Sequence, residues 1–121
     1  MKYKRVLLKV SGEALSGKTP IDFEKATETA LQIKALHDAG CLLGVVVGGG
    51  NIWRGRSGGT MDRSRADNIG MLATAMNALA LEQALIDLNV PVRVLSAVSM
   101  DMFMDSYSAR EANKSVDAGT V

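Results

Sequence analysis

Three short apolar runs along the chain predict buried β-strands. They lie at residues 4–10, 41–47 and 92–98, and turn-forming residues stand close to each of them. The second run is apolar throughout, which is typical of strands in parallel sheets that helices cover on both faces. Thr120 and Val121 resemble the first residues of a fourth strand.

The segments between these runs carry apolar residues at every third or fourth position, which predicts helices. Asp22 is a suitable N-cap for the first helix, and Gly40 is a suitable stop signal. Ser108 with Glu111 three residues later is a capping-box pattern for the last helix, which Gly119 would end.

A long helix is predicted over roughly residues 62–88, with Asn89 and Pro91 ending it. Two apolar stripes run along it, which indicates burial on more than one side, against a sheet and against a partner chain. One stripe holds Ile69, Leu72, Ala73, Met76, Leu79 and Ala80, and the other holds Leu81, Leu85 and Leu88.

The order of the elements is strand, helix, strand, helix, strand, helix. This alternation predicts an α/β fold with a mostly parallel sheet sandwiched by helices and with right-handed crossovers. The length of 121 residues fits one domain, spanning residues 1–121, with about three strands and three helices.

The overall charge is nearly balanced, with 14 Lys and Arg against 13 Asp and Glu and a net charge of +1. We therefore expect neither nucleic acid nor membrane as a partner, and no run of 18 apolar residues indicates a membrane span. Locally the charge is uneven, because Arg54, Arg56, Arg63 and Arg65 lie close together with Asp62 as the one acid. This excess suits an anionic ligand, but it fits a solvated basic loop equally well.

The single cysteine and the single histidine indicate no reactive site. Cys41 begins the second apolar run and is expected in the core, whereas His37 lies near the end of the first predicted helix. The N-terminus has no signal-peptide layout, so the cytoplasm is the expected compartment.

Two motifs fall at the ends of the first two predicted strands, where open parallel sheets bind their ligands. Lys9–Glu13 (KVSGE) closes the first strand, and Gly48–Gly55 (GGGNIWRG) closes the second. Glycines let backbone amides approach a phosphate closely, Lys9 could place a charge on a phosphoryl group in transit, and Arg54 could clamp phosphate oxygens. Taken alone, each motif also fits a structural role, as a tight turn or as an ordinary strand-end lysine.

A competing phosphate motif spans residues 12–19 (GEALSGKT), which match the P-loop pattern. In a P-loop the Lys-Thr pair opens a helix, but here Pro20 follows Thr19 and disfavours helical geometry at that residue. No later predicted strand ends in the aspartate that holds magnesium in such enzymes. We therefore interpret the match as accidental, and Lys18 as a residue without a catalytic role.

Three acidic residues, Asp67, Asp101 and Asp105, are candidates for sugar or metal contacts. Asp67 lies in the first turns of the long helix, near the arginine-rich loop, where a carboxylate could accept hydrogen bonds from ribose hydroxyls. It would equally favour the helix dipole with no ligand present. Asp101 and Asp105 lie in a loop to which the sequence assigns no role.

Taken together, the motifs resemble those of the bacterial UMP kinases, which have the amino acid kinase fold. The resemblance covers essentially all 121 residues. The first two motifs point only to the superfamily, which includes acetylglutamate, aspartate and carbamate kinases, whereas the segment from Asp67 to Thr74 is specific to UMP kinases. The matching segments are Lys9–Glu13, Gly48–Gly55, Ala66–Thr74 and Asp105–Ser108.

The resemblance implies transfer of a phosphoryl group from ATP to UMP, with Mg²⁺, giving ADP and UDP for pyrimidine nucleotide synthesis. It implies Lys9 and Arg54 as catalytic residues, Gly49 as a contact of the UMP phosphate and Asp67 as a contact of the UMP ribose. The implied ATP contacts are Lys9, Val10, Ser11, Gly12, Gly50 and Arg54.

The resemblance further implies a homo-oligomer, a hexamer of dimers built partly on the long helix. Such kinases are roughly twice as long, so the resemblance implies that residues 1–121 are the N-terminal, nucleoside monophosphate-binding part of an amino acid kinase-like domain, without the C-terminal nucleotide-binding half. We therefore expect these 121 residues alone to lack the adenine pocket and to be inactive or nearly so. The segment 16–20 is short where some members carry a glycine-rich stretch linked to GTP activation. The alternatives are a related kinase acting on a carboxylate or carbamate, a non-catalytic nucleotide-binding or assembly module, and a P-loop NTPase.

Overall fold

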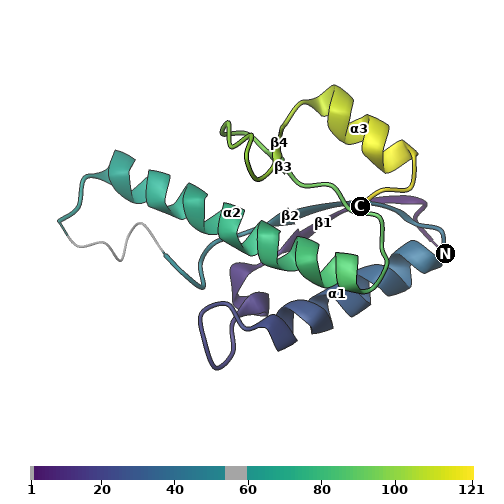
Figure 1. Cartoon of the computed structure of the whole chain (residues 1–121), viewed down its shortest axis with the longest axis horizontal. Coiled ribbons are helices and arrows are strands. Elements are labelled where there is room, and N and C mark those ends of the chain that lie inside the picture. Colours follow the sequence, from purple (N-terminus) through teal and green to yellow (C-terminus); the bar gives the residue numbers. More distant parts are fainter. Residues whose placement is uncertain (1, 54–59) are drawn as a thin grey trace.

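The computed structural model describes residues 2–53 and 60–121. β1 and β2 lie side by side in the middle of the molecule, with α1 and α2 on one side of them and α3 on the other (Figure 1). Along the chain the elements are β1 (Arg5–Val10), the 3-10 helix η1 (Gly12–Leu15), α1 (Phe23–Asp38), β2 (Leu42–Val47), α2 (Arg63–Asp87), β3 (Leu95–Ser96), β4 (Asp105–Ser106) and α3 (Ala109–Asp117).

The predicted helix ends are confirmed by the capping groups that the structure shows. The Asp22 carboxylate accepts a hydrogen bond from the Glu24 amide at 3.0 Å, and the Ser108 hydroxyl accepts one from the Glu111 amide at 3.1 Å. α2 begins after its N-cap Asp62, within a residue of the predicted start. These ends were predictable because a cap is a contact between residues close together in sequence.

The core lies between the paired strands and the two helices beneath them. β1 and β2 are parallel, with Arg5 opposite Leu42 and Val10 opposite Val47. Cys41 is buried there, as predicted, and is 3% exposed. β1 contributes only the partly buried Val6 and Leu8, and the other buried members come from η1, α1, β2, α2 and the residue Val90 after α2: Leu15, Ala26, Ala30, Ile33, Leu43, Leu81, Ala84, Leu85 and Val90.

α2 uses its two apolar stripes differently. Leu81 and Leu85 of the second stripe are buried in the core, whereas Leu72 and Met76 of the first stripe are about half exposed. α2 is also the one helix of the described residues that is long and apolar enough, by length and composition, to cross a membrane. Core helices of globular proteins meet the same criterion, and α2 packs along α1. A partner chain on the exposed stripe stays a prediction.

The third predicted strand is the main difference between the sequence analysis and the structure. Residues 92–98 were expected to form it, but only Leu95–Ser96 is strand, and it pairs in parallel with β4 instead of joining β1 and β2. A cavity of about 390 Å³, lined on one side by Val45–Val47 and on the other by Val92–Val98, separates this segment from β2, so the two do not pair. Residues 120–121 are likewise not a strand. Val121 nevertheless makes two backbone hydrogen bonds: its amide donates to the Pro91 carbonyl and its carbonyl accepts from the Arg93 amide, both at 2.9 Å.

Candidate active site at the ends of β1 and β2

The two motifs singled out in the sequence meet in the structure. The strands stay paired to their ends, and beyond them the Gly48 amide donates a hydrogen bond to the Val10 carbonyl at 2.9 Å. Gly12 then lies directly against the glycine turn, since a Cβ on it would stand 2.4 Å from Asn51 Oδ1 and 2.9 Å from the Gly50 nitrogen. A side chain at this position would push the motifs apart, so the contact depends on glycine.

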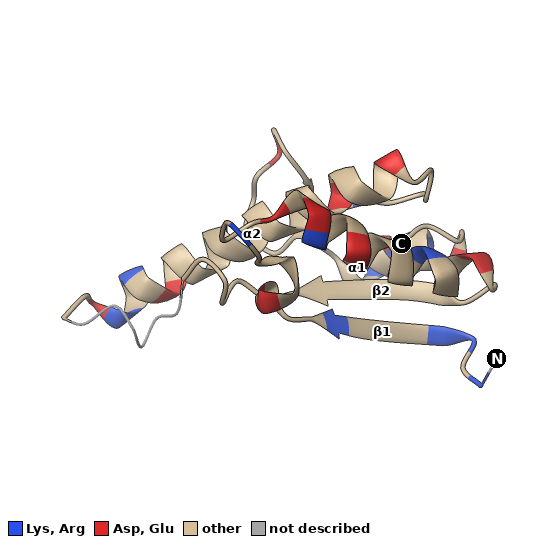
Figure 2. Ribbon diagram, turned by 90° about the horizontal axis from the view of Figure 1, so that it is seen from below, with Lys and Arg blue, Asp and Glu red and all other residues tan. Residues whose placement is uncertain are grey.

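Lys9 lies at the end of β1 with its side chain exposed. Figure 2 shows basic residues at both ends of β1 and no charged residue on β2. No carboxylate of the described residues forms an ion pair with the Lys9 amine. Its positive charge is therefore available to a ligand at this end of the sheet.

A groove of about 480 Å³ opens beside Lys9, between the end of β1, η1 and α1. Ser11 lines it and caps η1, because its Oγ accepts a hydrogen bond from the Glu13 amide at 3.2 Å. Polar groups from α1 complete the wall, namely Lys25, Glu28, Thr29 and Gln32. The groove is therefore polar, and its charged lining combines the amines of Lys9 and Lys25 with the carboxylates of Glu13 and Glu28.

The glycine turn after β2 is closed and held against α2. The amides of Ile52 and Trp53 both donate to the Gly49 carbonyl at 3.1 Å. A Cβ on Gly49 would stand 2.9 Å from Ala73 Cβ, so this glycine lets the turn lie directly on the helix. No described residue accepts a hydrogen bond from the amides of Gly49 and Gly50. Two successive amides of this kind are suited to binding an anion.

Asn77 fixes the glycine turn, a role that was not predicted from the sequence. This α2 residue is 0% exposed, and its amide nitrogen donates to the Gly48 carbonyl and to Asn51 Oδ1, both at 2.7 Å. Asn51 Nδ2 in turn donates to Asn77 Oδ1 at 3.0 Å and to the Pro20 carbonyl at 2.7 Å. One feature of the sequence does point to this role: Asn77 is a lone amide side chain within the apolar stretch of α2. A buried amide needs hydrogen-bond partners, so such a residue indicates a structural contact.

Trp53 brings the start of α2 to the same site. Its indole Nε1 donates to the Ala66 carbonyl at 3.0 Å, one residue before Asp67. Asp67 is exposed on α2. Asp67, the predicted ribose contact, therefore directly follows Ala66, the residue that accepts the hydrogen bond from Trp53. Arg54, the other predicted catalytic residue, lies outside the described residues, as does Arg56.

The P-loop match at residues 12–19 does not have P-loop geometry. The Lys18 amide donates to Asp22 Oδ2 at 3.1 Å, and the following helix begins only at Phe23. A Cβ on Gly17 would stand 2.3 Å from Asp22 Oδ2, so that glycine serves to admit the carboxylate. Hydrogen bonds from the Lys18 and Glu24 amides lower the pKa of Asp22. A fixed negative charge thus occupies the place where a P-loop would hold phosphate.

The acidic candidates of the later loop are engaged in structural contacts. Asp105 accepts a hydrogen bond from Arg93 Nε at 2.9 Å, and Glu111 accepts one from the same guanidinium at 2.9 Å. Asp101 accepts one from the Ser106 hydroxyl at 3.4 Å. The described residues contain no group of three His, Cys, Asp or Glu side chains that could hold a metal ion.

The chain is similar to known proteins in both sequence and structure. Residues 4–121 match the amino acid kinase family. The chain belongs to the amino acid kinase family. The UMP kinase of Ureaplasma parvum is similar over 100% of this chain and 53% of its own, with 41% identity and a TM-score of 0.91. The UMP kinase of Bacillus anthracis is similar over 98% of this chain and 50% of its own, with 36% identity and a TM-score of 0.90.

Membership of the amino acid kinase family confirms the predicted fold class, with parallel strands and flanking helices. The chain spans about half the length of the solved UMP kinases that it matches. The assignment of individual residues to ATP or to UMP stays a prediction. The structure does bring Lys9, Gly12 and the glycine turn together at one end of the sheet.

Proposed function

We propose that this chain carries the phosphate-binding strand ends of a UMP kinase, which transfers a phosphoryl group from ATP to UMP in pyrimidine nucleotide synthesis. One observation carries the proposal: Gly12 seats the end of β1, with the exposed Lys9, against the glycine turn after β2. The identity of 41% and 36% to proteins named UMP kinases supports the choice of substrate within the family.

In this proposal the chain supplies charge and fixed backbone donors, which phosphoryl transfer mainly requires. Lys9 stabilises the negative charge that develops on the phosphoryl group, and the amides of Gly49 and Gly50 bind phosphate oxygens. The remaining contacts of the ATP phosphates are made by Val10, Ser11, Gly12 and Arg54. On the UMP side, Gly49 contacts the phosphate and Asp67 contacts the ribose. Mg²⁺ would arrive bound to the ATP phosphates, whose charge it neutralises.

The proposal extends to the setting of the enzyme. The exposed apolar stripe of α2 supports a homo-oligomer, because exposed apolar surface marks contacts between chains. The ligands are ATP and UMP, with no role for nucleic acid or membrane, and the compartment is the cytoplasm. The adenine pocket and the rest of the UMP site belong to the half of the kinase that this chain does not span.

The test joins residues 1–121 to the second half of the Ureaplasma parvum UMP kinase and measures ADP release from ATP. We expect turnover with UMP, little with CMP, acetylglutamate or aspartate, and none from the 121 residues alone. Lys9→Ala should lower kcat by about 10²–10³-fold, the usual loss when one charge-stabilising donor is removed. Lys18→Ala is the matched control and should leave kcat unchanged.

Three outcomes would contradict the proposal. ADP release independent of UMP would refute the substrate. Loss of activity in Lys18→Ala, with Lys9→Ala unaffected, would move the phosphate site to residues 12–19. Tight UMP binding by the joined chain with no transfer to any substrate would favour a non-catalytic nucleotide-binding module.

A further inference from the structure

The glycine turn after β2 has little conformational restraint of its own. Gly48, Gly49 and Gly50 follow one another, and glycine adopts backbone conformations that other residues avoid. A peptide group between two glycines can therefore rotate at little steric cost, which exchanges the directions of its carbonyl and its N–H. A site for an anion needs the N–H groups outward. Each peptide group of the turn therefore needs a hydrogen bond that holds it in one orientation.

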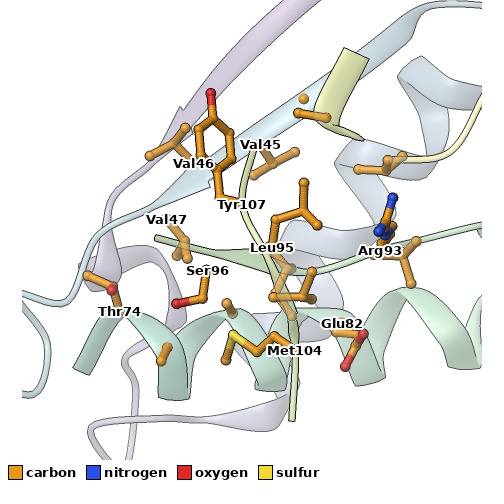
Figure 3. Close-up of a pocket in the computed structure, with 18 of the residues that line it drawn as sticks. Val45, Val46, Val47, Thr74, Glu82, Arg93, Leu95, Ser96, Met104 and Tyr107 are labelled. Carbon is orange, nitrogen blue, oxygen red and sulfur yellow. The ribbon is translucent and has the colours of Figure 1, made fainter. Parts of the chain in front are cut away.

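The position of the turn is set by α2. The helix passes the end of β2, where Thr74 of α2 and Val47 of β2 line the same cavity (Figure 3). A Cβ on Gly49 would stand 2.9 Å from Ala73 Cβ and 3.1 Å from the Thr74 nitrogen, so Gly49 lies directly on the helix. This contact determines where the turn lies, but packing against a glycine does not determine the direction of its amide.

The direction of the Gly49 amide is set by Asn77. The side-chain nitrogen of Asn77 donates a hydrogen bond to the Gly48 carbonyl at 2.7 Å. That carbonyl and the Gly49 N–H belong to one peptide group, and in a planar trans peptide the two point in opposite directions. The described residues contain no cis peptide bond. Because the Gly48 carbonyl is held toward Asn77, the Gly49 N–H points away from it.

The neighbouring Gly50 amide is held in a different way. It belongs to the same peptide group as the Gly49 carbonyl, which accepts hydrogen bonds from the amides of Ile52 and Trp53, both at 3.1 Å. These donors lie within the turn itself, so the Gly50 N–H keeps its direction without a contact from α2. The two successive amides are therefore positioned independently, one by a helix side chain and the other by the backbone of the turn.

We propose that Asn77 is a positioning residue for the phosphate acceptor: it directs the Gly49 amide at the phosphate of UMP and does not act on the ATP side. The inference rests on the proposed function, in which Gly49 contacts the UMP phosphate and Gly50 contacts the ATP phosphates. Asn77 is 0% exposed and touches neither nucleotide, so it acts through the peptide group after Gly48. Asn51 orients the Asn77 amide by the reciprocal hydrogen bonds of 2.7 and 3.0 Å between the two side chains.

The first test measures the KM of each substrate by ADP release, in the chain joined to the second half of the Ureaplasma parvum UMP kinase. Asn77→Ser removes the amide that holds the Gly48 carbonyl. We expect the KM for UMP to rise about 10–100-fold, the factor that a hydrogen bond to a charged group contributes, while the KM for ATP changes less than about twofold. A purely structural role would lower the amount of folded enzyme, which reduces the measured turnover and leaves both KM values unchanged.

Two further variants accompany Asn77→Ser. Ile33→Val removes a methyl group from the core at a side chain that is 2% exposed, so it should lower stability and leave both KM values unchanged. Asn51→Ala retains Asn77 but removes the partner that orients its amide, and it keeps the inference testable if Asn77→Ser does not fold. It should raise the KM for UMP by about threefold or more, with the KM for ATP unchanged, because the Gly49 carbonyl keeps both of its donors.

A second test needs no turnover. The ¹⁵N-labelled chain of 121 residues is titrated with inorganic phosphate, the group that both nucleotides share, and its backbone amides are followed by NMR. We expect the amide proton signals of Gly49 and Gly50 both to shift in the wild-type chain. In Asn77→Ser only the Gly50 signal should shift.

Equal KM values for UMP in the wild type and Asn77→Ser would overturn the inference, and so would parallel rises for UMP and ATP. A Gly49 signal that shifts with phosphate equally in both chains, or in neither, would overturn it too. Failure of the proposed function is a separate result, because the joined wild-type chain would then release no ADP in response to UMP. The phosphate titration would still decide whether Asn77 directs the Gly49 amide.

Discussion

The substitution Asn77→Asp tests the hydrogen-bonded pair that holds the glycine turn. It preserves the shape of the side chain, so it leaves no cavity, but it replaces a donor of two 2.7 Å hydrogen bonds by an acceptor. The Gly48 carbonyl and Asn51 Oδ1 would then each face an oxygen. Since the site is 0% exposed, water cannot replace the lost donors.

The magnitude follows from the two lost hydrogen bonds and the buried charge. Each lost bond costs about 1 kcal/mol or more, and a buried carboxylate with no cationic partner raises the total to about 3–5 kcal/mol. Burial with only one remaining donor, Asn51 Nδ2, raises the pKa of the introduced carboxyl, so its penalty is smallest where the group is protonated and grows as the pH rises. The loss of stability should therefore be larger at about pH 8 than at about pH 5.

Urea unfolding followed by circular dichroism at both pH values measures this loss. The matched control is Asn68→Asp, the same chemical change at an exposed position of the same helix, with an expected effect within about 0.5 kcal/mol. Equal unfolding free energies for the two variants, or a loss that does not depend on pH, would refute the reasoning.

Two further predictions concern the packing of Gly12 and the charge of Glu82. Gly12→Ala should lower the unfolding free energy by about 1–3 kcal/mol, because its Cβ would meet the Gly50 nitrogen at 2.9 Å. In Gly44→Ala the Cβ meets only the flexible end of Leu7, at 3.2 Å, so the effect should stay within about 0.5 kcal/mol; calorimetry showing equal Tm shifts would contradict this. Burial raises the pKa of Glu82 above its ordinary value of 4.5, so stability linked to this group is full below that pH and is lost as the pH rises. Glu82→Gln should therefore raise Tm at neutral pH, with the gain disappearing in acid; a gain of equal size at all pH values would show that the charge is not the cause.

The parts of the fold that the sequence predicted well depend on short-range contacts. The caps Asp22 and Ser108 act within three residues of themselves, so their patterns identify α1 and α3 without further information. The site was predictable for a related reason. Strand ends of parallel sheets gather on one edge, so the sequence alone predicts that Lys9 and the glycine turn meet.

The parts that the sequence did not predict depend on distant neighbours. Residues 92–98 have a strand-like sequence, but a strand requires a partner, and Val121 and β4 provide only part of one. The role of Asn77 arises from contacts with residues 26 and 29 positions away. The lone amide in an apolar stretch indicates a buried hydrogen bond, but no local pattern identifies its distant partners.

The amide pair has a mechanical consequence for the whole site. Asn51 is bonded at once to Asn77 in the middle of α2 and to the Pro20 carbonyl in the approach to α1. Moving the turn away from either segment would therefore break hydrogen bonds of this buried amide pair.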